Sequence, residues 1–103
     1  MDDASEVEAS TTEPELTALL HAMSDPQRLA MLKALADDGW HPCGAGDWGA
    51  GLHKSTVSHH VGILRDAGLL ETRKIGRNKH GRLRRSFIDA RFPGLLDGVL
   101  PNA

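Results

Sequence analysis

Apolar side chains recur at helical spacing through residues 53–68, whose sequence is HKSTVSHHVGILRDAG. At 100° per residue, three of them fall within about 60° of one another: Val57, Val61 and Leu64. Ser55 and His59 project from the opposite side, so small hydroxyls and imidazoles occupy the exposed face near its start. Gly68 supplies a stop signal, because the residue that follows a helix often needs a positive φ. The pattern predicts a short amphipathic helix over about residues 54–67, with a polar N-terminal tip.

Two further helices are expected before this stretch. Apolar residues at helical spacing predict a first helix from Pro14 to about Met23. Ser24 is the expected cap of the second helix, since Gln27 three residues later completes a capping box. Gly39 is expected to end this second helix.

The chain after Gly68 has the pattern of a β-hairpin followed by a last helix. The expected first strand, loop and second strand cover residues 69–75, 76–81 and 82–88. Arg85 falls on the apolar side of the second strand, and the pattern gives no reason for it. Asp89 is the expected cap of the last helix, which contains Phe92 and further apolar residues up to Leu100.

Residues 39–52 contain five glycines and a proline, which leaves room only for a short helix around residues 45–50. The elements therefore run helix, helix, short helix, polar-tipped helix, β-hairpin, terminal helix. This mainly α fold with a small β-hairpin is a winged helix-turn-helix. We expect one domain over residues 13–103, preceded by a disordered acidic tail over residues 1–12.

Charge is distributed very unevenly along the chain, although the formal net charge is only −2. Residues 1–15 carry six acids and no base, whereas residues 54–91 carry ten Lys and Arg against three acids, an excess of seven positive charges. A basic half of this kind is typical of a protein that binds a polyanion.

Several classes of protein are disfavoured by what the sequence lacks. Cys43 is the only cysteine, so no internal disulfide can form. The chain has neither a signal region nor an apolar run of membrane-spanning length, so we expect a soluble cytoplasmic protein with no membrane partner. No nucleophile triad or paired-carboxylate arrangement can be distinguished, so we do not expect an enzyme.

Two stretches resemble the ArsR/SmtB family of bacterial repressors. LLHAMSDPQRLAMLKAL, residues 19–35, is similar to one family pattern, and KSTVSHHVGILRDAGLL, residues 54–70, is similar to a second and more specific one. The ending ARFPGLLDGVL resembles actinobacterial members. The resemblance implies a winged-helix homodimer, paired through its first and last helices, that binds a double-stranded DNA operator with two-fold symmetry.

The resemblance also implies which residues would contact DNA. The recognition helix, about residues 54–67, would enter the major groove, and the basic wing over residues 76–82 would lie on the backbone. Carried over by position, the contact residues are Lys54, Ser55, Thr56, Ser58 and His59 on the helix and Arg77, Lys79 and Arg82 on the wing. His60 lies at the edge of the apolar stripe and is expected to be a half-buried, hydrogen-bonded packing residue.

A metal site is a further hypothesis, because nitrogen, sulfur and oxygen donors lie close together in the glycine-rich segment. His41, Cys43 and Asp47, with His21 from the first helix, carry donors suited to nickel or zinc. Two alternatives stay open: this chain binds the metal itself, or control is delegated to a separate co-regulator protein.

A rival of a different class is a winged-helix module used for protein association, in which the basic hairpin meets an acidic partner. That alternative predicts no preference for any operator sequence.

Overall fold

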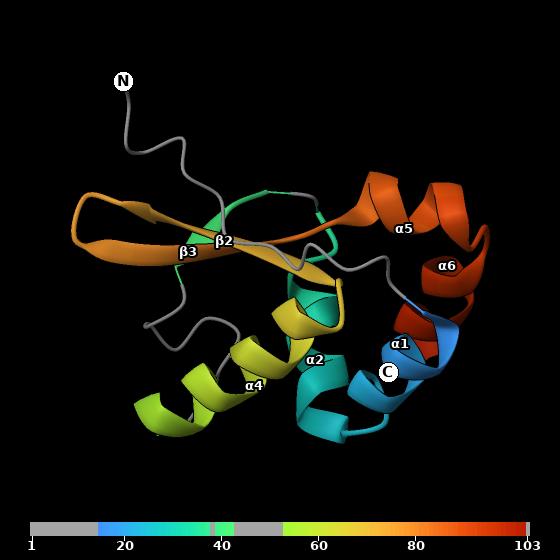
Figure 1. Ribbon diagram of the computed structural model, residues 1–103, viewed down its shortest axis with the longest axis horizontal. Helices are drawn as coiled ribbons and strands as arrows, with labels where there is room; N and C mark the ends of the chain where they lie inside the picture. The colour runs from blue at the N-terminus through green and yellow to red at the C-terminus, as the bar shows by residue number, and fades with distance from the viewer. Residues whose placement is uncertain (1–14, 38, 43–52, 103) are drawn as a thin grey trace.

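The computed structural model describes residues 15–37, 39–42 and 53–102 of the chain. Its elements, in chain order, are α1 (Leu16–Ala22), α2 (Pro26–Ala34), β1 (His41–Pro42), α4 (Lys54–Asp66), β2 (Leu70–Ile75), β3 (Asn78–Leu83), α5 (Arg85–Arg91), α6 (Leu95–Val99) and the 3-10 turn η2 (Leu100–Asn102). Helices pack together while a β-hairpin projects from them (Figure 1), which confirms the predicted winged helix-turn-helix. The expected tail over residues 1–12 and the short helix around residues 45–50 lie outside the described residues.

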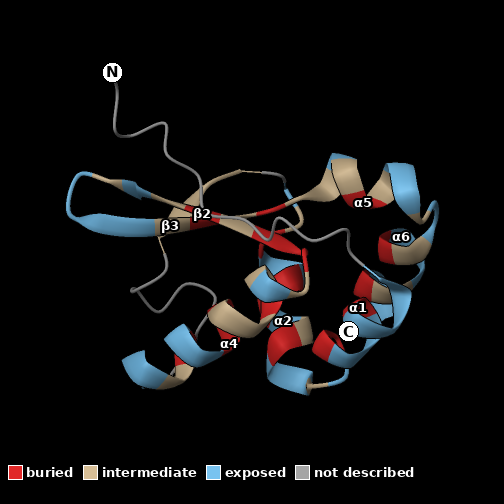
Figure 2. Cartoon of the chain, in the orientation of Figure 1, coloured by how far each residue is buried: buried red, intermediate tan, exposed pale blue. Residues whose placement is uncertain are grey.

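The predicted apolar stripe of α4 forms part of the core. Val57, Val61 and Leu64 are buried, and Gly68 has the expected positive φ of 92°. The stripe packs in one cluster with buried leucines and methionines of α1, α2, β2 and the C-terminal helices. Figure 2 shows this cluster as buried faces that turn toward one another, while the start of α4 and the hairpin tip are exposed. The core therefore fixes the back of α4 and leaves its N-terminal tip free.

The start and end of α2 differ from the prediction. Asp25, not Ser24, is the N-cap, and its carboxylate accepts hydrogen bonds from the backbone N–H groups of Gln27 (2.8 Å) and Arg28 (3.1 Å). The reason is Pro26, which disfavours helical geometry in the residue before it and so leaves Asp25 extended, as a cap must be.

The helix also ends at Ala34 rather than continuing to Gly39. Beyond it, the Asp37 carboxylate accepts the Gly39 backbone N–H at 2.9 Å and a hydrogen bond from His41 Nε2 at 2.8 Å. Such local side-chain bonds compete with helical ones. The bond from His41, and after it the Gly39 N–H, lowers the pKa of Asp37 below its ordinary value of 3.8.

The sheet has three antiparallel strands in the order β1-β3-β2, one more than predicted. The hairpin turn is only two residues long, with Gly76 at a φ of 64°, so the predicted loop over residues 76–81 was wrong. The second strand ends at Leu83, not at residue 88. The hairpin tip extends beyond the core, so the first residues of β3 do not alternate between apolar and polar. Without that alternation the sequence pattern could not identify them as a strand.

The segment after β3 is helical, which explains Arg85. This residue opens α5 and forms ion pairs with Asp89 one turn later, at 3.3 Å, and with Asp97 of α6. Asp89 therefore lies inside α5 and is not the cap of the last helix. Gly94, at a φ of 85°, separates α5 from α6. No helix in the described part of the chain has the length and apolar character needed to cross a membrane.

The cap of α2 gives this fold a predicted pH dependence. The backbone N–H of Arg28 is the main cause, with that of Gln27, of a pKa of Asp25 below its ordinary value of 3.8. The stabilisation is therefore present above pH 3.8 and is lost as the pH falls through the lower, folded pKa. Asp25→Asn keeps a good cap without a titrating group. We expect its melting temperature to match wild type at pH 7 and to fall less between pH 5 and pH 3.

Asp25→Ala is the matched control, because it removes the cap itself: it should melt below wild type at pH 7, and the difference should shrink as the pH falls through the folded pKa of Asp25. An acid-induced drop in melting temperature that is equally steep in Asp25→Asn and wild type would contradict this account.

Candidate nucleic-acid interface

The N-terminal tip of α4 carries the polar residues predicted for it. Lys54, Ser55, Ser58 and His59 are exposed, and Thr56 is partly buried. His53, to which no role was assigned from the sequence, is the N-cap: its Nδ1 accepts the backbone N–H of Ser55 at 3.3 Å and lies 3.0 Å from the Ser55 hydroxyl. The tip thus presents hydrogen-bonding groups on a helix start that is internally capped.

The tip of the β-hairpin is strongly cationic. Residues 73–80 contain Arg73, Lys74, Arg77 and Lys79 and no acid. The last three of these are exposed, and the register pairs Lys74 directly with Lys79. Like charges directly opposite on neighbouring strands destabilise a sheet. The hairpin therefore carries a charge arrangement that opposes its own stability and favours an anionic partner.

The strand pleat assigns these cations to two faces. Side chains alternate along each strand, so Lys74 and Lys79 lie on the same face as buried Leu70 and Leu83. Lys74 was not among the predicted contact residues, because it precedes the expected loop; only the strand register shows that it faces Lys79.

Arg82 lies on the other face of the hairpin, where it meets an aromatic ring. Its guanidinium carbon is 5.6 Å from the ring centroid of Trp40, and that of Arg73 is 4.4 Å away. Both distances fit cation–π contacts. Next to Trp40, β1 pairs with β3, with His41 opposite Gly81. Trp40 and β1 thus connect residues 40–42 to the hairpin.

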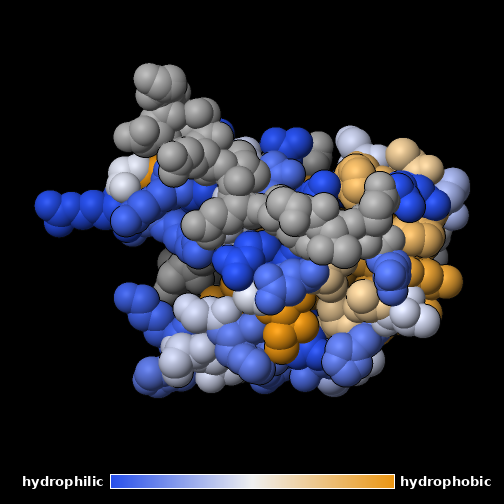
Figure 3. Space-filling view, viewed as in Figure 1, coloured by the Kyte–Doolittle hydropathy of each residue, from blue (hydrophilic) through white to orange (hydrophobic). Residues whose placement is uncertain are grey.

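The two polar regions project from the same end of the molecule. In Figure 1 the start of α4 and the hairpin tip both point to the left, whereas α1, α5 and α6 lie at the right. Hydrophilic residues cover the left end in the space-filling view, and hydrophobic ones gather at the right (Figure 3). Both polar regions therefore lie at the end of the molecule opposite α1, α5 and α6 in this view.

The metal hypothesis stays a prediction. His21 is exposed at the end of α1, and His41 donates to Asp37, which the sequence had not included in the candidate set. Cys43 and Asp47 lie outside the described residues. The residues that the structure describes contain no group of three or more potential ligands from His, Cys, Asp and Glu.

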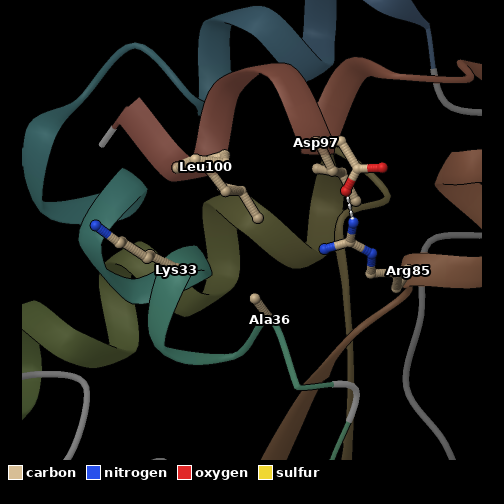
Figure 4. A pocket seen from close by; sticks show the side chains of 7 residues that line it. Lys33, Ala36, Arg85, Asp97 and Leu100 are labelled. Carbon is tan, nitrogen blue, oxygen red and sulfur yellow. Dashed lines mark hydrogen bonds and ion pairs between the residues drawn. The ribbon is translucent and has the colours of Figure 1, made fainter.

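A pocket of about 230 Å³ lies away from this interface, between α2 and the C-terminal helices. Its walls are Lys33, Ala36, Arg85, Leu96, Asp97, Leu100 and Pro101. Figure 4 shows Leu100 and Ala36 across the opening from each other and the Arg85–Asp97 ion pair at one side. This ion pair links α5 to α6.

Comparison with known proteins agrees with this geometry. Residues 23–73 match a helix-turn-helix domain family. The chain is 36% identical over 80 residues to the uncharacterized HTH-type transcriptional regulator YceK of Bacillus subtilis (strain 168), covering 77% of this chain and 80% of YceK.

Solved structures share the fold. The transcriptional repressor BigR from Xylella fastidiosa is 26% identical with a TM-score of 0.60, covering 75% of this chain and 85% of BigR. An ArsR family transcriptional regulator has a TM-score of 0.63 at 23% identity, covering 81% and 84% of the two chains.

Lys74 and Lys79, which face each other, should lower the stability of the hairpin and strengthen its binding to polyanions. Lys74→Gln removes one of two like charges, so we expect the free energy of unfolding to rise by about 0.2–1 kcal/mol. The same variant should elute earlier from heparin. Lys74→Arg, which keeps the charge, should change neither the unfolding free energy nor the elution. A Lys74→Gln variant that is less stable, or equally retained on heparin, would contradict this role.

Proposed function

Because this chain belongs to the ArsR family of helix-turn-helix transcriptional regulators, we propose that it is a dimeric repressor of sequence-specific type. In this proposal α4 enters the major groove of an operator, and the hairpin acts as a wing on the neighbouring phosphates. The observation that carries it is the shared direction of the α4 tip and the cationic hairpin tip.

The α4 tip has the chemistry needed to read bases. The major groove is about 12 Å wide and admits an α-helix, and its base edges offer distinct donors and acceptors. Ser58 and His59 are exposed on the polar face of α4 and carry a hydroxyl and an imidazole. Lys54 and Ser55 lie at the helix start, where a cation and a hydroxyl suit a phosphate. We therefore assign base reading to Ser58 and His59 and positioning to the helix start.

The wing supplies affinity rather than sequence choice. Lys74, Arg77 and Lys79 are exposed at its tip, and each phosphate that a cation neutralises contributes about −0.9 to the slope of log K against log salt. Arg82 stands further back, beside Trp40, so we rank it below the three tip residues.

The end opposite the wing supports a two-fold dimer. Leu16 and Leu20 lie one turn apart on α1 and remain 45% and 46% exposed. Partly buried apolar residues of the C-terminal helices add to the hydrophobic surface at this end. Burial against a second copy would remove this surface from water and leave both wings free. Two α4 helices would then enter major grooves about 34 Å apart.

Two substitutions separate base reading from backbone contact. His59→Ala should reduce affinity for the selected operator by about 1–3 kcal/mol while leaving affinity for random DNA unchanged. Lys79→Ala should weaken binding to both DNAs alike and flatten the salt slope by about 1. Selection of bound DNA from random sequence, followed by titrations at several salt concentrations, measures both effects. A wild-type protein without any sequence preference would instead support the protein-association alternative.

The dimer surface is tested on α1. We expect Leu20→Glu to give a monomer in analytical ultracentrifugation and to bind a two-fold operator far more weakly than wild type, because it buries a charge against a partner. Ala18→Glu places the same charge at an exposed position on the other side of α1 and should remain a dimer. If Leu20→Glu also remains a dimer, α1 is not the interface.

A further inference from the structure

A buried polar cluster joins α2 to the inner side of α4. Arg28 and His60 are only 8% and 7% exposed, in a core made mainly of apolar side chains. Arg28 Nη1 lies 3.3 Å from His60 Nδ1, and His60 Nε2 lies 3.2 Å from Gln27 Oε1. Both ring nitrogens of His60 are therefore bonded to α2.

The donors and acceptors of this cluster fit in one way only. A guanidinium can only donate, so His60 Nδ1 must accept and carries no proton. The ring proton then sits on Nε2 and donates to Gln27 Oε1. If the ring turns, or if α4 rotates, at least one buried polar group loses its partner, at a cost of about 1–3 kcal/mol.

The α2 side of the cluster is itself held in place. Arg28 Nε donates to the Ala22 carbonyl at 2.7 Å, which satisfies one of the free carbonyls at the end of α1. Asp25 caps the turn that carries Gln27 and Arg28. The cluster is thus a fixed support made by α1 and α2, against which α4 is set.

Rotation of α4 is the motion that this support restrains most directly. A helix with its side chains has a radius of about 5–6 Å, so a turn of about 20° moves an outer side chain by roughly 2 Å. A hydrogen bond to a base tolerates only a few tenths of an ångström. The apolar contacts of Val57, Val61 and Leu64 are non-directional and resist such a rotation less sharply. His59 is the residue next to His60, and the two rings lie 5.7 Å apart.

We propose that Arg28 and Gln27 are positioning residues for DNA sequence discrimination, which they control by holding His60 and so setting the rotation of α4. This inference rests on the proposed function, because it takes α4 as the helix that reads the operator. None of the three residues needs to touch DNA in this role. A purely structural role would lower stability without changing the preference for one DNA sequence over another.

The test compares binding to the selected operator with binding to a random duplex of equal length, at a temperature where circular dichroism shows each variant folded. We expect His60→Leu to lose tenfold or more in operator affinity, with affinity for the random duplex and its salt slope unchanged within about twofold. His60→Gln keeps one acceptor and one donor and should recover most of the preference.

Gln27→Leu serves as the second variant, since Gln27 is exposed and its loss should leave folding intact. We expect a three- to tenfold loss in the operator preference, whereas Ala30→Leu, at an exposed site on the same helix, should show none. Equal loss on both DNAs, or an unchanged preference in Gln27→Leu and in a folded His60→Leu, would overturn the proposal. A wild-type protein without operator preference would instead overturn the proposed function, which distinguishes the two failures.

Discussion

The arrangement of the helices depends on the hydrogen bonds that the buried guanidinium of Arg28 donates. A charged side chain inside a small core costs several kcal/mol unless all of its donors find partners. Two of its donors have partners on neighbouring helices: Nε donates to the Ala22 carbonyl at the end of α1, and Nη1 donates to His60 Nδ1 in the middle of α4. Because hydrogen bonds are directional and apolar contacts are not, this one side chain fixes the relative setting of three helices that hydrophobic burial alone would only bring together.

The fold separates two kinds of surface. The start of α4 and the hairpin tip gather hydrogen-bonding groups and positive charge at one end, and α1 with the C-terminal helices gathers apolar side chains at the other. The separation matches the proposed function, in which one end binds an anionic duplex and the other end binds a second copy of the chain. The paired lysines of the hairpin show that the polar end is not arranged for stability alone.

The wing is also connected to the rest of the molecule on its outer face. Trp40 lies against Arg73 and Arg82, and the short strand β1 pairs with β3 beside it. The hairpin base is therefore held between the core and residues 40–42. In the proposed function, the exposed cations at the hairpin tip are the part of the wing that contacts the DNA phosphates.

The sequence by itself determined the features that depend on neighbours a few residues apart. The 3.6-residue period identified α1, α2 and α4, Gly68 marked the end of α4, and the charge count located the basic half. Family resemblance in residues 19–35 and 54–70 was enough for the fold and the class of protein. Only the tertiary structure decided what depends on contacts far apart in the chain: the facing of Lys74 and Lys79, the helical place of Arg85, and the bonds from Arg28 and Gln27 to His60. Strand register and buried hydrogen bonds depend on how elements far apart in the chain pack against one another. The local periodicity of the sequence does not contain that information.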